Sequence, residues 1–140
     1  LAITGTNGKT TTTALTARLV ERAGRRVVAA GNIGPTLLDT LARSLDAEAA
    51  PESTALPEVW VMELSSFQLD GVSGFEPSAA TVLNLSQDHL DWHGTMQALA
   101  EAKARIFGQH ALMVINRDEA AGRAMVPQPQ AADAPQLLAW

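Results

Sequence analysis

The chain has 140 residues, of which 46% are hydrophobic and 18% charged, a profile typical of one globular domain with a buried core. Its net charge of −5, without any cluster of Lys and Arg, argues against nucleic acid or an anionic membrane surface as the main partner. The sequence contains no cysteine, which excludes disulfides and zinc–thiolate sites, and no apolar run approaches the roughly 18 residues of a membrane span. The chain lacks an initiating Met and begins inside an apolar run, so we expect a piece of a longer protein.

The first half of the chain alternates short apolar runs with helical patterns. It predicts, in order, a strand, a helix, a second strand and a second helix, at residues 1–4, 9–23, 26–31 and 36–45. Gly24 stands where the first helix needs a C-terminal cap, and Pro35 is expected in the first turn of the second helix. Residues 46–58 are polar, contain two prolines and predict a surface loop.

The second half continues the alternation. It predicts two strands, a helix and a further strand, at residues 59–64, 79–85, 95–107 and 111–116. Residues 126–135 predict an exposed loop, and residues 136–140 the start of another strand. The strands are continuous apolar runs, so we expect both sheet faces to be covered, in an α/β fold with a mainly parallel sheet flanked by helices. The order of the strands does not follow from this pattern.

Polar residues lie at the ends of five of the predicted strands. They are the loop 5–10, Asn32, the segment 63–68, Asn84 with Asp88, His89 and Asp91, and Asn116 with Asp118. In an open parallel sheet, ligands bind in the crevice beyond the carboxyl ends of the strands. Loops are usually polar, but charged and amide residues directly at the ends of five strands are more than this general tendency predicts. We therefore expect a binding site at this edge of the sheet.

The loop "GTNGKT" has the residues of a phosphate-binding loop. Gly5 and Gly8 permit backbone angles that point successive N–H groups at one anion, and the helix that follows adds its positive end. Lys9 is placed to reach the outer phosphates and Thr10 to bind Mg²⁺. The spacing is two residues shorter than G-x-x-x-x-G-K-[ST], which leaves a simple strand-to-helix turn as the alternative. Four consecutive threonines are poor helix formers, which favours the phosphate interpretation.

Two further residues suggest a metal site. Glu63 ends an apolar strand beside the loop, and in nucleotide hydrolases an acid at this place holds Mg²⁺. Without the loop beside it, Glu63 would be interpreted as a solvated acid at the end of a strand. His89 has Asp88 and Asp91 beside it to orient its ring, and a metal ligand, a base and a helix cap are all open for it. His93 is expected to be exposed.

Lys103 falls in the apolar stripe of its helix, where an apolar residue belongs. A lysine at the edge of a core can extend its charged end to water, which is the simpler interpretation. A desolvated lysine instead loses its charge more readily and becomes nucleophilic. A neutral amine can take up CO₂ as a carbamate, which can bind a metal.

Together these motifs resemble the central ATP-binding domain of the Mur ligases, the bacterial enzymes that add amino acids to the peptidoglycan precursor. The matching segments, in order, are "TGTNGKTTT", "GNIG", the acid after the third strand, "NLSQDHLDWHG" and "AKARIF". The short phosphate loop is the form that this P-loop NTPase-like family has. "ELSSFQL" with "GNIG" looks most like the members that add D-glutamate to UDP-N-acetylmuramoyl-L-alanine. Other amino-acid-adding members and the folylpolyglutamate synthases carry different residues after the acid.

The resemblance implies a role for each matching residue. ATP would be held by the loop residues Gly5, Thr6, Asn7, Gly8, Lys9, Thr10 and Thr11. One Mg²⁺ would be held by Thr10 and Glu63, and a second by His89 and carbamylated Lys103. The muramoyl-alanine substrate would meet Asn32, Ser65 and Gln68. The residues with catalytic roles would be Lys9, His89 and Lys103.

The resemblance also implies a reaction. The substrate carboxylate would attack the γ-phosphate of ATP to give an acyl phosphate, and the amine of D-glutamate would then form the amide. We expect a cytoplasmic monomer that acts on small molecules in cell-wall synthesis, and hence in cell shape and division. Residues 1–140 would be an incomplete central domain without the UDP-binding and D-glutamate-binding domains, inactive when isolated. The alternatives are a polyglutamate-adding relative and a nucleotide-dependent switch module, and a switch would not need His89 and a carbamylated Lys103.

Overall fold

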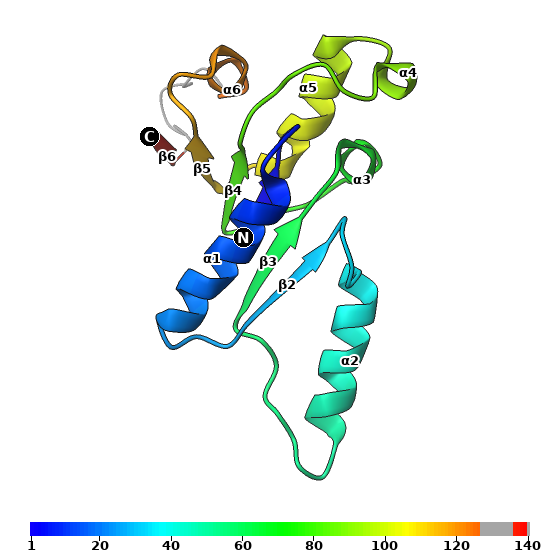
Figure 1. The fold of residues 1–140 in the computed structure, drawn as a ribbon, viewed down its shortest axis with the longest axis vertical. Coiled ribbons are helices and arrows are strands. Elements are labelled where there is room, and N and C mark those ends of the chain that lie inside the picture. Colours follow the sequence, from blue (N-terminus) through cyan, green and yellow to red (C-terminus); the bar gives the residue numbers. More distant parts are fainter. Residues whose placement is uncertain (127–135, 140) are drawn as a thin grey trace.

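A computed structural model describes residues 1–126 and 136–139 of the chain. In these residues six parallel strands form one sheet in the order β2-β3-β1-β4-β5-β6 (Figure 1). The strands are β1 (Ala2–Thr4), β2 (Val27–Gly31), β3 (Val59–Glu63), β4 (Ala79–Val82), β5 (Leu112–Ile115) and β6 (Leu137–Ala139). The predicted α/β class with a mainly parallel sheet is confirmed, and the strand that begins in residues 136–140 is present.

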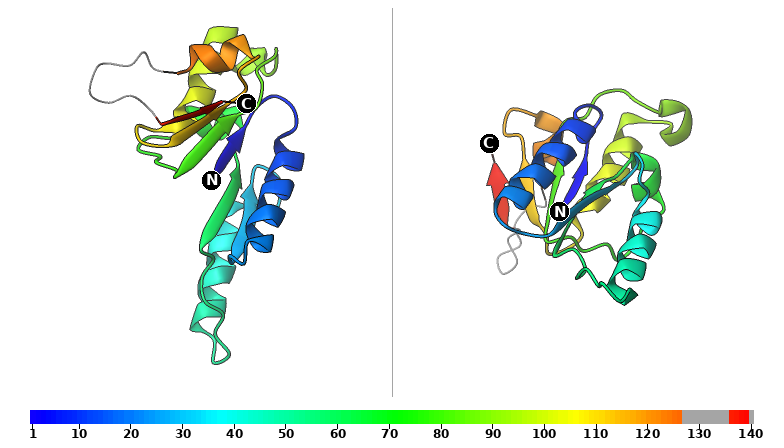
Figure 2. Two further views of the ribbon diagram at one scale, coloured as in Figure 1. Left: turned by 90° about the vertical axis from the view of Figure 1, so that its left-hand side faces the viewer. Right: turned by 60° about the horizontal axis from the view of Figure 1, so that its bottom comes forward.

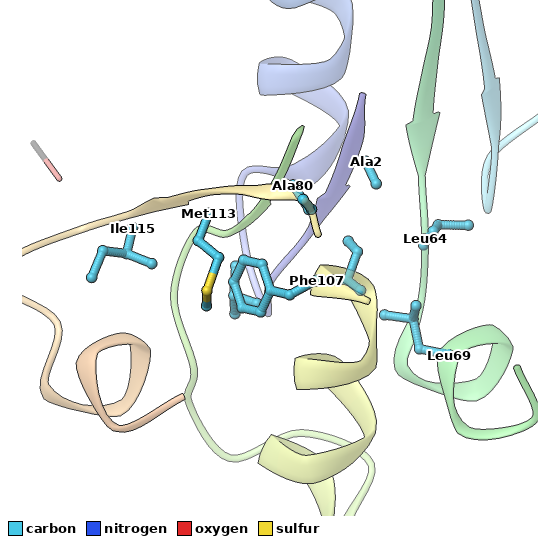
Figure 3. Close-up of a cluster of buried hydrophobic side chains, with 10 residues drawn as sticks. Ala2, Leu64, Leu69, Ala80, Phe107, Met113 and Ile115 are labelled. Carbon is cyan, nitrogen blue, oxygen red and sulfur yellow. The ribbon is translucent and has the colours of Figure 1, made fainter. Parts of the chain in front are cut away.

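Helices cover both faces of this sheet. They are α1 (Lys9–Arg22), α2 (Leu37–Ala49), α3 (Ser66–Asp70), α4 (Leu90–His93), α5 (Met96–Ala104) with the 3₁₀ turn η1 (Arg105–Phe107), and α6 (Ala120–Ala124). The α1 helix packs on β1, β2 and β3, while α3 and α5 lie on the opposite face (Figure 3). The α2 helix lies at one end of an elongated molecule and α5 and α6 at the other (Figure 2). No helix in the described residues combines the length and apolarity that crossing a bilayer requires.

The main hydrophobic core lies between the sheet and the α3–α5 layer (Figure 3). Its buried members are Ala2, Leu64, Leu69, Ala80, Val82, Ile106, Phe107, Ala111, Met113 and Ile115. Leu69 and Ile106 are almost completely removed from water. Burial of side chains of this size stabilises the fold by about 1.5–3 kcal/mol each. This layer fixes α5, and with it the position of Lys103 relative to β1.

The second helix differs from the sequence-based prediction at both ends. It continues to Ala49, so residues 46–49 are helical and not part of the predicted loop. Residues 47–49 are Ala, Glu and Ala, which are good helix formers, and Pro51 lies just beyond the end of the helix. Thr36 is the N-cap, accepting a hydrogen bond from Asp39 N, so Pro35 precedes the cap instead of lying in the first turn.

Three short helices, α3, α4 and α6, were not predicted, because four or five residues do not establish a hydrophobic period. The β4 strand ends at Val82, three residues earlier than expected, because the chain there turns against the loop that follows β1. Beyond Val126, the exposed loop predicted for residues 126–135 lies outside the described residues.

Candidate functional site

The predicted crevice lies where β1, β3 and β4 end side by side. Because β1 pairs with β3 on one side and β4 on the other, the segments that follow these strands meet at one edge of the sheet. An open cavity of about 340 Å³ lies there, lined by residues 6–11, Asn32, Ile33 and Glu63. The site is therefore built from the loop after β1 and from residues that follow β2 and β3.

The loop before α1 requires glycine at two positions. Gly5 has φ +150°, and a Cβ added to it would lie 3.1 Å from Leu83 Cβ and 3.3 Å from Leu83 N. Gly8 has φ +81° and is the N-cap of α1, so the first N–H groups of the helix face out of the loop. With the positive end of the helix dipole behind them, these N–H groups can bind an anion.

Lys9 lies across this loop. Its Nζ donates hydrogen bonds to Gly5 O at 3.0 Å and to Thr6 O at 2.9 Å. The side chain is half-buried, and within residues 1–126 and 136–139 its ammonium bonds to backbone carbonyls and forms no ion pair. A phosphate in the cavity would offer this ammonium a stronger, charged acceptor.

Glu63 is the buried acid of the site, 1% exposed at the end of β3. Thr10 Oγ1 donates to Glu63 Oε2 at 3.0 Å, and Asn32 Nδ2 donates to Glu63 Oε1 at 3.3 Å. Asn32 N also donates to Glu63 O at 2.8 Å. The structure thus joins Thr10 and Glu63, as the metal hypothesis requires, and places Asn32 against the same carboxylate.

Gly31 makes this contact possible. A Cβ at this position would lie 2.0 Å from Glu63 O, and Gly31 has φ +141°. Only glycine lets the end of β2 approach the end of β3 so closely. The first glycine of "GNIG" is therefore required by the backbone geometry around Glu63.

Lys103 is 2% exposed, as its place in the apolar stripe predicts. Its Nζ donates to Gly5 O at 2.9 Å, so the carbonyl of Gly5 receives both lysines of the site. The pKa of Lys103 is lowered from its usual 10.5 to about 8, chiefly by burial and also by the nearby charge of Lys9, with Asp88 acting in the opposite direction. The amine therefore becomes neutral far more readily than a lysine in water.

His89 lies beyond β4 in the left-handed backbone region, with φ 49°, as the N-cap of α4. Its side chain is 46% exposed, with Nε2 3.4 Å from Asp88 Oδ1 and its ring 4.6 Å from that of Phe67. The predicted exposure of His93 is wrong. His93 is half-buried and stacks on Phe67 at 5.9 Å, because the turn of α4 brings both histidines to the same aromatic ring.

Ser65 and Gln68 bind each other. Ser65 Oγ accepts from Gln68 N at 3.3 Å, and Gln68 Oε1 accepts from Ser65 N at 2.9 Å, a capping box that begins α3. Besides the substrate contact that we expect of them, these two side chains therefore have a structural role at the start of α3. The S-x-x-Q spacing is the signal that could have predicted this helix start.

Two residues of the site were not assigned from sequence. Phe67 packs against His89, His93 and Trp92. Asn84 binds the backbone of the phosphate-type loop. The position of Asn84 directly after a strand indicated a residue of the site. Nothing in the sequence indicated its hydrogen-bond partners, which lie about 80 positions earlier in the chain.

The donor set fits Mg²⁺ better than a metal held by protein ligands alone. In the described residues no three His, Cys, Asp or Glu side chains form a metal-binding group. Mg²⁺ usually takes one or two carboxylates and completes its shell with phosphate oxygens and water. Thr10 and Glu63, which line the cavity together, provide the protein part of such a shell.

Residues 3–137 match the family model of the Mur ligase middle domain. The chain belongs to this family. Among curated Mur ligases, it is 63% identical over 129 residues to the UDP-N-acetylmuramoylalanine–D-glutamate ligase of Albidiferax ferrireducens, which covers 92% of this chain and 24% of that one. It is 55% identical over 140 residues to the ligase of the same name from Burkholderia cenocepacia, covering 100% and 27%.

A solved structure has the same middle-domain fold. MurF from Acinetobacter baumannii superposes with a TM-score of 0.63 at 19% sequence identity, covering 99% of this chain and 30% of that one. The chain spans about a quarter of the length of the curated relatives that it matches.

Proposed function

We propose that this chain is the ATP-binding part of a ligase that joins D-glutamate to UDP-N-acetylmuramoyl-L-alanine in peptidoglycan synthesis. The observation that carries the proposal is the convergence on one loop: Thr10 contacts buried Glu63, and buried Lys103 reaches Gly5 from another helix. The amino-acid specificity is supported by the names of relatives that are 55–63% identical and by "ELSSFQL" at residues 63–69. ATP, Mg²⁺ and small-molecule substrates of the cytoplasm follow from this assignment.

In this proposal the loop and the start of α1 bind the β- and γ-phosphates of ATP. Lys9 Nζ turns from the carbonyls of Gly5 and Thr6 toward the phosphate oxygens. Thr10 and Glu63 hold one Mg²⁺, which when bound neutralises charge on the phosphate that is transferred. Burial of Glu63 keeps its carboxylate fixed for this role.

Lys103 and His89 would hold a second Mg²⁺ beside the substrate carboxylate, Lys103 as a carbamate. The lowered pKa of Lys103 supports this, because only the neutral amine takes up CO₂. The amine nitrogen bonds to the carbon of CO₂ and one proton leaves to water. The carbamate keeps one N–H, which can still donate to Gly5 O, and gains two oxygens that can bind a metal.

The substrate carboxylate then attacks the γ-phosphorus, ADP leaves and an acyl phosphate forms. The amine of D-glutamate attacks the acyl carbon, and phosphate leaves as the amide forms. Asn32, at the edge of the cavity, is our candidate for contact with the muramoyl-alanine. Ser65 and the exposed side chain of Gln68 are the other candidates, acting from the start of α3.

The test is ADP release by the full-length protein with UDP-N-acetylmuramoyl-L-alanine and ATP, offered D-glutamate, L-glutamate or glycine in turn. We expect release that depends on D-glutamate, and none from residues 1–140 alone. Release with a folate and L-glutamate would favour the polyglutamate-adding alternative. ATP hydrolysis that no amino acid stimulates would favour a nucleotide switch and contradict the proposal.

A further inference from the structure

The side chain of Asn84 holds the loop between β1 and α1 from the neighbouring strand. Its Oδ1 accepts from Thr6 N at 3.1 Å and from Asn7 N at 2.9 Å, and its Nδ2 donates to Asn7 O at 3.0 Å. Thr6 N also donates to Asn84 O at 3.1 Å. One amide thus satisfies three backbone groups of two consecutive loop residues.

A second pair of hydrogen bonds continues this contact along the segment after β4. Thr6 Oγ1 donates to Ser86 O at 3.2 Å and accepts from Ser86 N at 3.1 Å. Ser86 lies three residues before His89. The loop after β1 and the segment that carries His89 are therefore joined by two reciprocal sets of hydrogen bonds.

These contacts divide the N–H groups of the loop by role. The N–H groups of Thr6 and Asn7 point at Asn84 and are not directed into the cavity. The N–H groups in the first turn of α1 have no partner within the helix. An anion in the cavity would thus meet residues 8–11, while residues 6–7 serve to shape the loop.

We infer that Asn84 is a positioning residue of the nucleotide site, which holds the loop in its anion-binding shape and joins it to the His89 segment. The inference rests on the proposed function, because it assumes that the anion is the triphosphate of ATP. Asn84 does not touch the phosphates; it acts through the peptide groups of Thr6 and Asn7. Its loss should therefore weaken the binding of ATP and leave the binding of D-glutamate unchanged.

The test compares full-length Asn84→Ala with the wild-type protein. We expect the KM for ATP, and the Kd of ATP from titration calorimetry, to rise about tenfold or more, while the KM for D-glutamate stays within about twofold. The control is Gln97→Ala, which removes an exposed amide side chain that donates to Glu101 Oε1 on α5 and should leave the KM for ATP unchanged. A wild-type KM for ATP in folded Asn84→Ala would overturn the inference.

A second variant keeps the inference testable if Asn84→Ala fails to fold. Thr6→Val is nearly isosteric and removes only the hydroxyl that binds Ser86, and we expect it to raise the KM for ATP about threefold. A wild-type KM for ATP in Thr6→Val would contradict the inference. If Asn84→Ala also folds, the double variant should lose less than the product of the two single effects, because both side chains maintain the same contact between the loop and the segment after β4. If the two effects on the KM for ATP multiply fully, Asn84 and Thr6 act independently, which would contradict a shared contact between the loop and the segment after β4.

The outcomes separate this inference from the proposed function. If the wild-type protein fails to ligate D-glutamate but Asn84→Ala weakens ATP binding, the inference stands and the ligase assignment falls. If the wild-type protein ligates D-glutamate and Asn84→Ala binds ATP normally, the ligase assignment stands and the inference falls.

Discussion

Lys103 is a residue whose chemistry is set by where the fold holds it. A lysine amine in water stays charged at neutral pH, but that of Lys103 is enclosed between α5 and β1 and bonded to one carbonyl. Its pKa, lowered mainly by desolvation, is about 8, so a usable fraction is neutral near pH 7. If the neutral amine becomes a carbamate, a carboxylate added to the solution should take over the function of that carbamate in a variant without the lysine side chain.

We predict that Lys103→Ala lowers the kcat of the full-length ligase by at least about a hundredfold, and that acetate restores part of it. The measurement is D-glutamate-dependent ADP release with and without acetate. Glu101→Ala is the control, because Glu101 is exposed on the same helix, and it should retain wild-type activity. Full activity in Lys103→Ala would contradict a role for the carbamate.

At the scale of the elements, the contact between β2 and β3 depends on one glycine. We predict that Gly31→Ala destabilises the protein by about 3 kcal/mol, because its methyl group would overlap Glu63 O in a backbone conformation that alanine disfavours. Urea denaturation measures the change. Gly71→Ala is the matched control, since nothing lies within 4 Å of the added Cβ, and it should change stability by less than about 0.5 kcal/mol. Equal effects of the two substitutions would show that the close approach at Gly31 does not limit stability.

Sequence periodicity was sufficient for the long elements and insufficient for their ends. The helices at 9–23 and 95–107 agree with the structure within a few residues, because each carries several turns of pattern. The extension of α2 to Ala49 was missed, since good helix formers outweighed the polarity that suggested a loop. Strand order could not be predicted, because it depends on contacts between segments far apart in the chain.

The candidate site was predictable where a residue's own position carried the information. Lys103 interrupts an apolar stripe and is buried as that place indicates. Glu63 was singled out by its position at the end of an apolar run, although its burial did not follow from that position. The roles of Ser65, Gln68 and Asn84 could not be inferred in the same way. Their hydrogen bonds depend on a short helix and on a loop that only the folded sheet brings into reach.

For the whole molecule, bound nucleotide should act as a stabiliser. A ligand at 100 times its Kd adds about 2.7 kcal/mol to the free energy of unfolding. We therefore predict that ATP with Mg²⁺ raises the thermal midpoint of the full-length protein by several degrees. In Glu63→Gln, which keeps the shape of the side chain, the part of the shift that depends on Mg²⁺ should be lost.

The control for this measurement is Glu48→Gln on the exposed face of α2, which should show the full shift. A shift in Glu63→Gln equal to that of the wild-type protein would mean that Mg²⁺ binds elsewhere. A shift with Mg²⁺ alone that exceeds the shift with ATP would also contradict the site, because the metal shell needs phosphate oxygens.

The position of β1 has a consequence for how the protein reaches its folded state. This first strand lies in the middle of the sheet, where Ala2 pairs with Met62 on one side and Ala80 on the other. During synthesis β1 emerges before both of its neighbours in the sheet, and such distant pairings form slowly. The loop after β1 cannot take its final shape before β4 arrives with Asn84. We therefore expect the capacity to bind a nucleotide to appear late in folding, when β3 and β4 have paired with β1.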